Sequence, residues 1–188
     1  MRFYIGIDPG LSGAMAVINE KGKIVSILDA PTIKTKTGKK NRTLLVETEM
    51  VDFLESWNDN TGNGHSLEMV TIENVHAMPE QGVTSMFSMG HGFGLWLGII
   101  AALRIPVTRV EPIRWKKEMG IAGKSDKGAS VVRALQLYPS CRELTRDYRR
   151  GGDTLQTLLH GRADALLIAE WGRTQALHGS ESRLKSLK

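Results

Sequence analysis

The first thirty residues place three short apolar segments so close together that no helix fits between them. The segments span residues 3–8, 13–18 and 23–28, and each has the composition or the alternation of a β-strand. Tight turns separate them, at Pro9-Gly10 and at Asn19-Glu20-Lys21-Gly22. Parallel neighbours would need a crossover of about a dozen residues or more. We therefore expect an antiparallel meander of three strands.

Beyond the meander, helical and strand-like segments alternate. Residues 34–42 and 140–153 are polar and are predicted as loops. Thr43 is the expected N-cap of a helix over residues 44–54. The other expected elements are strands at 69–73 and 106–110, and helices at about 84–103, 113–119, 125–138 and 154–175. This order predicts an α/β fold with a mixed five-stranded sheet, three antiparallel strands and then two parallel ones, flanked by helices.

The chain is sized for one domain and shows no internal linker. Its 188 residues are predicted to form a single domain, 1–188, with a core over about 3–175 and a basic C-terminal tail, 176–188. The single cysteine, Cys141, cannot form an internal disulfide, which fits a reducing compartment. No apolar run approaches the roughly 20 residues of a membrane span. With no signal or transit peptide before the first strand, we expect a cytoplasmic protein with no membrane partner.

Two acids end predicted strands. Asp8 closes the first strand just before its turn, and Glu73 closes the strand at 69–73. Taken alone, Asp8 fits an ordinary turn start and Glu73 fits a solvated strand end. If the two strands are neighbours, however, their carboxyl ends bring both acids to one crevice.

A third acid lies in the last predicted helix. His160 and Asp164 are four residues apart and share one helical face. Such a pair is often a surface ion pair, but here the neighbours are small or apolar, which favours a packed helix. These neighbours are Ala163, Ala165, Leu166, Leu167, Ile168 and Ala169.

Three carboxylates and an imidazole suit hard divalent cations, Mg²⁺ or Mn²⁺. Two such ions about 3.5–4 Å apart clamp the attacking and leaving oxygens of a phosphodiester displacement. Zinc is disfavoured, since the chain has neither a cysteine cluster nor a pair of nearby histidines. The Gly-x-Ser-x-Gly of serine hydrolases is absent, and residues 120–125 lack the glycine spacing of a P-loop.

Basic residues gather in three segments of a chain whose net charge is +5. One segment interleaves Trp115 with Arg114, Lys116, Lys117, Lys124 and Lys127. The second contains Arg142, Arg146, Arg149 and Arg150, and the third is residues 34–42. Each would ordinarily be a solvated face, but beside a carboxylate metal site we interpret them as a track for a phosphate backbone.

Several motifs occur in order along the chain: Gly6-Ile7-Asp8-Pro9-Gly10-Leu11-Ser12-Gly13-Ala14, Ile72-Glu73, Gly92-Phe93-Gly94-Leu95-Trp96-Leu97-Gly98-Ile99, Trp115-Lys116, and the helix from His160 to Ala169. This ordered set resembles the RuvC Holliday junction resolvases, and within them the phage and plastid branch. The resemblance spans residues 3 to about 173. It implies an RNase H-like fold and a homodimer that nicks four-way DNA junctions symmetrically, leaving 5′-phosphate and 3′-hydroxyl ends, in a bacterial or phage-infected cell.

The resemblance also implies a catalytic set. Asp8 would bridge two metal ions, while Glu73 and Asp164 would each hold one of them. The implied ion is Mg²⁺, and Mn²⁺ is expected to support activity as well. His160 stands where many members of the family have an aspartate, so it is an implied metal ligand as well. Lys127, with Lys124 as its alternate, matches a lysine that approaches the scissile phosphate.

Further residues are implied to contact DNA or a second subunit. His76, Met78, Gln81 and Phe87 follow Glu73, where the family reads or wedges bases, although Phe87 fits a buried core equally well. Lys116 resembles a DNA-contacting lysine, and Arg114 and Lys117 are expected to join it. Residues 90–102 match the helix that pairs across the two-fold axis, although simple packing on the sheet is a compatible alternative. Nothing in the sequence identifies a helicase partner.

Three alternatives remain open at this point. The nearest is another RNase H-like nuclease, acting on flaps or RNA–DNA hybrids. A non-catalytic junction-binding protein is disfavoured, because all three acids are retained. A sugar-kinase or actin-like ATPase shares the Asp8 turn, but proteins of that class carry two such domains, and 188 residues hold only one.

Overall fold

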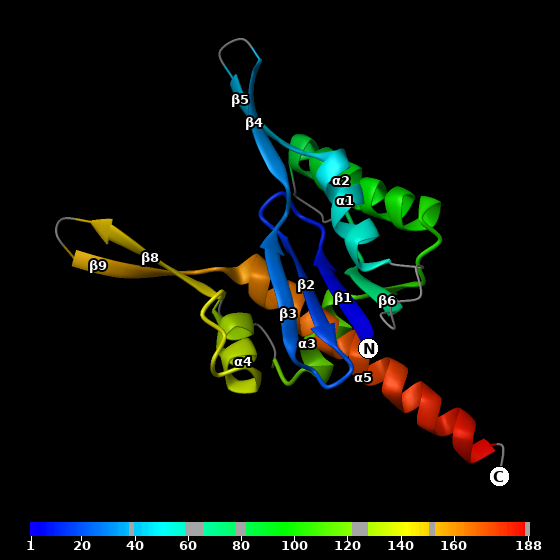
Figure 1. The fold of residues 1–188 in the computed structure, drawn as a ribbon. Helices are drawn as coiled ribbons and strands as arrows, with labels where there is room; N and C mark the ends of the chain where they lie inside the picture. Colours follow the sequence, from blue (N-terminus) through cyan, green and yellow to red (C-terminus); the bar gives the residue numbers. More distant parts are fainter. Residues whose placement is uncertain (38–39, 59–65, 78–81, 122–127, 151–152, 187–188) are drawn as a thin grey trace.

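The computed structural model describes residues 1–37, 40–58, 66–77, 82–121, 128–150 and 153–186, and it is built around one five-stranded sheet (Figure 1). The strand order is β3-β2-β1-β6-β7. The first three strands are antiparallel, and β6 and β7 then continue parallel to β1. Their bounds are β1 (Arg2–Asp8), β2 (Ala14–Asn19), β3 (Ile24–Asp29), β6 (Ser66–Glu73) and β7 (Val107–Val110). The predicted meander and the two added parallel strands are therefore confirmed.

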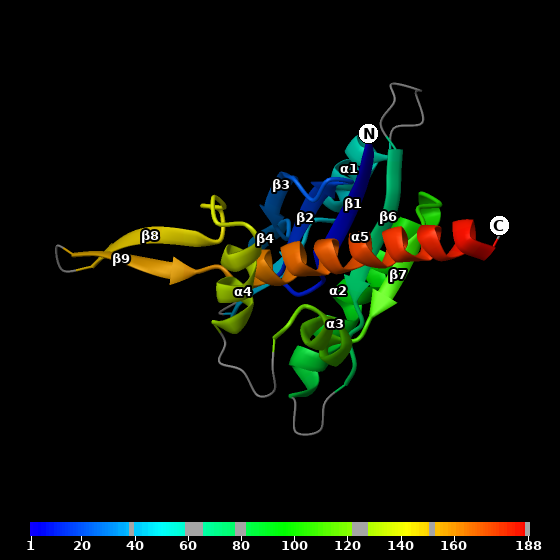
Figure 2. The same ribbon diagram turned by 90° about the horizontal axis from the view of Figure 1, so that it is seen from below.

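Helices cover both faces of this sheet. One face carries α5 (His160–Ser186), which runs across β2, β1 and β6 (Figure 2). The opposite face packs against α1 (Glu47–Trp57) and α2 (Val83–Ala102). Two shorter helices, α3 (Pro112–Glu118) and α4 (Ala129–Leu137), lie on the α5 side. The predicted helix at 125–138 is confirmed from residue 129 onward, whereas residues 125–127 lie outside the described part of the chain.

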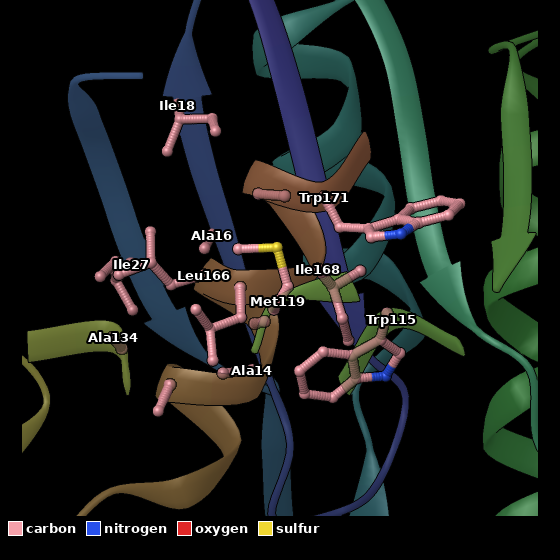
Figure 3. Close-up of a cluster of buried hydrophobic side chains, with 14 of the residues drawn as sticks. Ala14, Ala16, Ile18, Ile27, Trp115, Met119, Ala134, Leu166, Ile168 and Trp171 are labelled. Atoms are coloured by element: carbon pink, nitrogen blue, oxygen red, sulfur yellow. The ribbon is translucent and has the colours of Figure 1, made fainter. Parts of the chain in front are cut away.

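Strand β1 separates two cores because its side chains alternate between the faces. Phe3, Ile5 and Ile7 join the core under α1 and α2, and Tyr4 joins the core under α5. Gly6 faces α5 at very close range, since a Cβ at this position would lie 2.1 Å from the carbonyl oxygen of Ala165. The missing side chain allows the backbone of α5 to lie directly on the central strand. Figure 3 shows apolar side chains of the surrounding core, among them Ala16 and Ile27 of the sheet with Leu166 and Ile168 of α5.

Two hairpins stand apart from the sheet, and neither is in our sequence prediction. The first joins β4 (Thr32–Thr37) to β5 (Lys40–Leu45), and the second joins β8 (Thr145–Arg150) to β9 (Asp153–Leu158). Both project from the body of the molecule (Figure 1). Residues 34–42 are thus mainly strand, and the β-branched residues at 32, 33, 35 and 37 explain why.

The helices next to these hairpins begin later than predicted. Thr43 pairs with Lys34 inside the first hairpin, so it is not an N-cap, and α1 starts at Glu47 instead. In the same way β9 takes residues 153–158, and α5 starts at His160 and not at 154. This helix also continues through most of the predicted basic tail, 176–188, and ends at Ser186.

Helix α2 contradicts our statement that no apolar run approaches the length of a membrane span. By length and composition alone, it is the one helix in the described part of the chain that is long and apolar enough to cross a membrane. Trp96 and Ile100 anchor it in the core beneath the sheet, yet only 17% of its most apolar window is buried. Phe93, Leu95, Leu97 and Ile99 are partly buried against the same core, whereas Val83 and Phe87 are exposed, so part of the apolar surface of α2 is uncovered in a single copy of the chain.

Candidate active site

Two of the three predicted acids lie side by side at one edge of the sheet. Ile7 of β1 and Ile72 of β6 are partners in a parallel pair. The next residue in each strand is an acid, Asp8 or Glu73, so both carboxylates leave the sheet at the carboxyl ends of neighbouring strands. This confirms the adjacency on which the sequence argument depended.

The third acid is brought over this edge by the first turn of α5. A Cβ at Gly161 would lie 2.4 Å from the carbonyl oxygen of Ser12, so the helix begins directly against the loop that follows Asp8. Asp164 lies one turn into the helix, and its charge acts on both Asp8 and Glu73. The three acids therefore form one electrostatic group.

Burial raises the pKa of every acid in this group, and repulsion from the other acids raises that of Asp8 and Glu73 further. Asp8 is the extreme case, because burial first, and then the charges of Glu73 and Asp164, raise its pKa to about 7. One hydrogen bond opposes this rise, donated by the Gly10 N–H to Asp8 Oδ1 at 3.3 Å. Burial is also the largest cause of the raised pKa of Glu73 and of Asp164.

Two neutral hydrogen-bond donors lower the pKa of Glu73 and of Asp164, and so partly offset the effect of burial. The indole N–H of Trp115 donates to Glu73 Oε1 at 2.8 Å. The Ser130 hydroxyl hydrogen bonds to Asp164 and lowers its pKa. Neither donor brings a positive charge to the cluster.

The cluster fits divalent cations with oxygen ligands. Asp164 Oδ1 is buried and has no hydrogen-bond partner in the described structure, which is costly unless a cation uses that oxygen. Within the described residues, no three His, Cys, Asp or Glu side chains already meet as a metal-binding group. The three acids thus interact electrostatically, without forming a complete metal-binding group among the described residues.

Lys116 is the predicted DNA-contacting residue that the structure brings to the acids. It lies on α3 and is half-buried, with its ammonium 5.2 Å from the centre of the Trp115 ring. Its charge lowers the pKa of Asp8, Glu73 and Asp164 alike. The ammonium therefore lies where it can meet an anionic substrate at the acid cluster.

The flanking basic residues of α3 are placed differently. Arg114 pairs with Glu118 at 3.0 Å and lies over the Trp171 ring, so its guanidinium is engaged within the protein. Lys117 is exposed. Lys124, Lys127 and Gln81 lie outside the described residues, as does Met78.

The predicted base-contacting residues after Glu73 are exposed where they are described. His76 Nε2 lies 2.7 Å from Glu111 Oε2, and Asn74 donates to Glu111 Oε1 at 2.7 Å, which ties this segment to the start of α3. Phe87 is 76% exposed on α2 and stacks with His91 one turn later. The core alternative for Phe87 is therefore wrong in a single copy of the chain.

His160 is the exposed first residue of α5, and its charge acts on Asp164. The expected shared helical face of these two residues is confirmed. Metal binding by the imidazole of His160 remains a prediction.

Sequence reasoning missed the residues that hold the site together. Trp115 belongs to the Trp115-Lys116 motif, but its hydrogen bond to Glu73 was not predicted, and Ser130 carries no local signal. Arg162 lies inside the motif of the last helix, yet its role was not predicted: it forms two hydrogen bonds with Asp29, at 2.6 and 2.8 Å. No local pattern marks such partners, because they are distant in sequence and meet only in the fold.

Comparison with known proteins shows which family shares this arrangement. The family model described as "Crossover junction endodeoxyribonuclease RuvC" matches residues 4–140. The chain is 32% identical over 94 residues to the chloroplastic Holliday junction resolvase MOC1 of Chlamydomonas reinhardtii, a match that covers 50% of this chain but only 10% of that relative.

Solved structures share the fold. The structure of T. thermophilus RuvC in complex with a Holliday junction substrate has a TM-score of 0.58 and 14% identity, covering 95% of this chain and 97% of that chain. A second structure of Thermus thermophilus RuvC has a TM-score of 0.53 and 16% identity, covering 94% and 96%. The mixed sheet and its helices are therefore the RNase H-like architecture that the sequence predicted.

Proposed function

Because this chain belongs to the RuvC family of crossover junction endodeoxyribonucleases, we propose that it is a Holliday junction resolvase that hydrolyses phosphodiester bonds in four-way DNA. The observation that carries the proposal is the convergence of Asp8, Glu73 and Asp164 at one sheet edge, with the pKa of each raised. Burying three carboxylates together costs free energy, and bound divalent cations would offset that cost.

We assign the divalent ions of this site to Mg²⁺, with Mn²⁺ also effective, and expect two ions for each active site. Asp8 is central and would contact both, while Glu73 and Asp164 would each hold one side and His160 would complete the second. When bound, such ions supply charge neutralisation and an activated water for phosphodiester hydrolysis. Asp164 Oδ1, buried without a partner in the described structure, supports this assignment.

The remaining residues of the site act on the substrate. Lys116 faces the acid cluster and supplies positive charge where the phosphate would lie. Water attacks the phosphorus, the bond to the 3′ oxygen breaks, and that oxygen takes up a proton. The products are a 5′-phosphate and a 3′-hydroxyl. Lys127, which lies outside the described residues, remains a proposed second contact to this phosphate.

We propose that the arms of the junction lie against the basic hairpins. The segment 30–46 carries five basic residues and no acid, and Lys34, Lys36 and Arg42 are exposed on β4 and β5. Arg146 is exposed at the start of the second hairpin. Because each phosphate contact displaces counterions, such side chains supply affinity that does not depend on DNA sequence.

We further propose that a second copy of the chain covers α2. Gly90, Gly94 and Gly98 follow one another at intervals of four residues, and at each of them an added Cβ would meet no atom within 4 Å. Residues spaced in this way lie along one face of a helix, so the backbone of a partner helix can approach closely there. The exposed apolar side chains of Val83 and Phe87 on α2 support the same conclusion.

A panel of end-labelled substrates tests the proposal. It contains a four-way junction, a flap, an RNA–DNA hybrid and a linear duplex, each incubated with Mg²⁺ or Mn²⁺. We expect paired nicks at symmetric positions in the junction and little cleavage of the duplex. Preferential cleavage of the flap or of the hybrid would instead identify another RNase H-like nuclease.

A further inference from the structure

Two buried tryptophans in this molecule have matching surroundings. Trp115 and Trp171 both lie in the apolar cluster between α5 and the sheet (Figure 3). Each donates its indole N–H to a glutamate, Trp115 to Glu73 at 2.8 Å and Trp171 to Glu118 at 2.7 Å. Each also has a cation over its ring, because Lys116 lies over Trp115 and Arg114 over Trp171. Only the first of these two glutamates belongs to the acid cluster.

The indole of Trp115 is a rigid donor. Its side chain is fully buried, and its backbone is fixed at both ends of α3, with Trp115 N–H bonded to the Glu111 carbonyl at 3.1 Å and Met119 N–H to the Trp115 carbonyl at 2.8 Å. A glutamate side chain has several rotatable bonds and loses conformational freedom when it is held in one place. A fixed donor on Oε1 therefore selects one orientation of the Glu73 carboxylate.

The same ring also locates a positive charge. Lys116 follows Trp115 on α3, and its ammonium lies 5.2 Å from the ring centre. This ammonium acts on all three acids of the cluster. A single buried side chain thus contacts one member of the acid cluster and the cation that faces the whole cluster.

We propose that Trp115 is a positioning residue, which holds Glu73 through its indole N–H so that the free carboxylate oxygen is oriented for a divalent cation. This inference rests on the proposed function, because it assumes that the acid cluster binds metal ions. Hydrogen-bond partners that orient metal ligands typically change metal affinity or activity by about 10-fold to 100-fold when they are removed.

The matched tryptophan provides the control. Trp115→Phe and Trp171→Phe remove the same indole group from the same core, and each removes one hydrogen bond to a glutamate. Glu118 keeps its hydrogen bonds from Arg114 and Gln175. We expect both variants to lose comparable thermal stability. Only Trp115→Phe should bind Mn²⁺ more weakly, by about 10-fold or more, as measured by calorimetric titration or by electron paramagnetic resonance of the metal-free full chain.

A second substitution isolates the N–H itself. Benzothienylalanine at position 115 replaces the indole N–H by sulfur and keeps the shape of the ring, so the core stays filled even if Trp115→Phe fails to fold. We expect the same loss of Mn²⁺ affinity, with binding of a four-way junction in EDTA unchanged. Single-turnover cleavage should fall by a similar factor.

The outcomes separate this inference from the proposed function. Wild-type affinity for Mn²⁺ in the sulfur analogue, or an equal loss of affinity in Trp171→Phe, would overturn the positioning role. Selective loss of Mn²⁺ affinity at position 115 supports that role even if the wild-type chain cuts no junction. In that last case the proposed function fails and the role of Trp115 in the metal site stands.

Discussion

Asp8 and Glu73 each follow the last paired residue of two adjacent parallel strands, so the register of Ile7 with Ile72 places the two acids side by side. A register shift of one residue would turn one of the carboxylates to the opposite face of the sheet. The pairing of β1 with β6 is therefore the structural basis of the candidate active site, and Asp164 is added to it by α5.

The stability of the metal-free protein should fall as the pH rises from about 4 to about 7. Asp8 has an ordinary pKa of 3.8 and a folded-state pKa of about 7, so in this range the folded state holds a proton that the unfolded state has lost. The resulting destabilisation reaches an order of magnitude of about 4 kcal/mol above pH 7. Urea unfolding in EDTA across this range measures it.

The Asp8→Asn variant is the control for that pH dependence. It should match the wild type near pH 4 and be more stable than the wild type near pH 8, because the amide cannot ionise. Added Mn²⁺ should restore the wild type at pH 8 and leave the variant nearly unchanged. Parallel stability curves for the two proteins in EDTA would show that Asp8 does not carry this charge repulsion.

The ion pair between Arg162 and Asp29 should stabilise the start of α5. Arg162 reaches Asp29 with two nitrogens and the Glu143 carbonyl with a third, at 3.1 Å, so one side chain joins the end of β3 to the segment before β8. Asp29→Asn should lower the free energy of unfolding by about 1 kcal/mol at most, because the carboxylate is half exposed and screened by solvent.

The pH dependence of this effect has the opposite sign to that of Asp8. Arg162 lowers the pKa of Asp29, so the pair stabilises the protein above the ordinary pKa of an aspartate and is lost as the pH falls through the lowered value. The difference between the wild type and Asp29→Asn in chemical denaturation should therefore vanish in strong acid. A difference that grows toward acid pH would contradict the assignment.

Replacing Gly94 by Leu should separate the proposed dimer without unfolding the subunit. A Cβ added at Gly94 would meet no atom within 4 Å, so leucine has room to begin a side chain there, and it improves helix propensity by somewhat less than 1 kcal/mol. Sedimentation velocity should show a dimer for the wild type and a monomer for Gly94→Leu.

Val132→Leu, at an exposed position of α4, is the control for this substitution. It adds apolar surface to a different helix and should leave the dimer intact. A dimer that persists in Gly94→Leu would place the interface somewhere other than this face of α2.

Charge reversal in the first hairpin should weaken junction binding. Lys34→Glu with Lys36→Glu should raise the Kd for a four-way junction, because both lysines are exposed on β4 and no acid lies nearby in the segment. The slope of log K against log salt should become shallower by about 0.9 for each phosphate that the variant no longer neutralises. Fluorescence anisotropy in EDTA at several salt concentrations measures both quantities.

A reversal of equal charge at the opposite end of the sheet is the control. Lys21 and Lys23 lie at the turn between β2 and β3. Asn19, which begins this turn, pairs with Phe3 at the start of β1, whereas Asp8 lies at the other end of that strand. Lys21→Glu with Lys23→Glu should change Kd much less. Equal effects of the two double variants would indicate a response to net charge alone and would remove the hairpin from the DNA interface.

The sequence predicted those parts of the molecule that local patterns determine. Short turns imposed the antiparallel meander of the first three strands. The spacing of His160 and Asp164 correctly placed them on one helical face. Each of these conclusions depends on neighbours within a few residues, where backbone geometry leaves few alternatives.

Contacts between distant segments could not be predicted in this way. The hydrogen bond from Trp115 to Glu73 joins residues 42 positions apart, and the Asp29–Arg162 pair joins residues 133 positions apart. The hairpins were missed for a different reason, since their lysines and arginines suggested loops while the β-branched residues between them favoured strands. The glycine pair at 151 and 152 is a hairpin signal that polarity obscured.

Cleavage of an end-labelled four-way junction by the wild type and by Asp8→Asn tests the central claim most directly. Each protein is first titrated against the junction in EDTA, and Mg²⁺ or Mn²⁺ is then added. We predict equal binding by both proteins, symmetric ligatable nicks by the wild type, and no product above the metal-free background with Asp8→Asn. Junction binding by the wild type without cleavage in either metal, or cleavage by Asp8→Asn at the wild-type rate, would contradict the account.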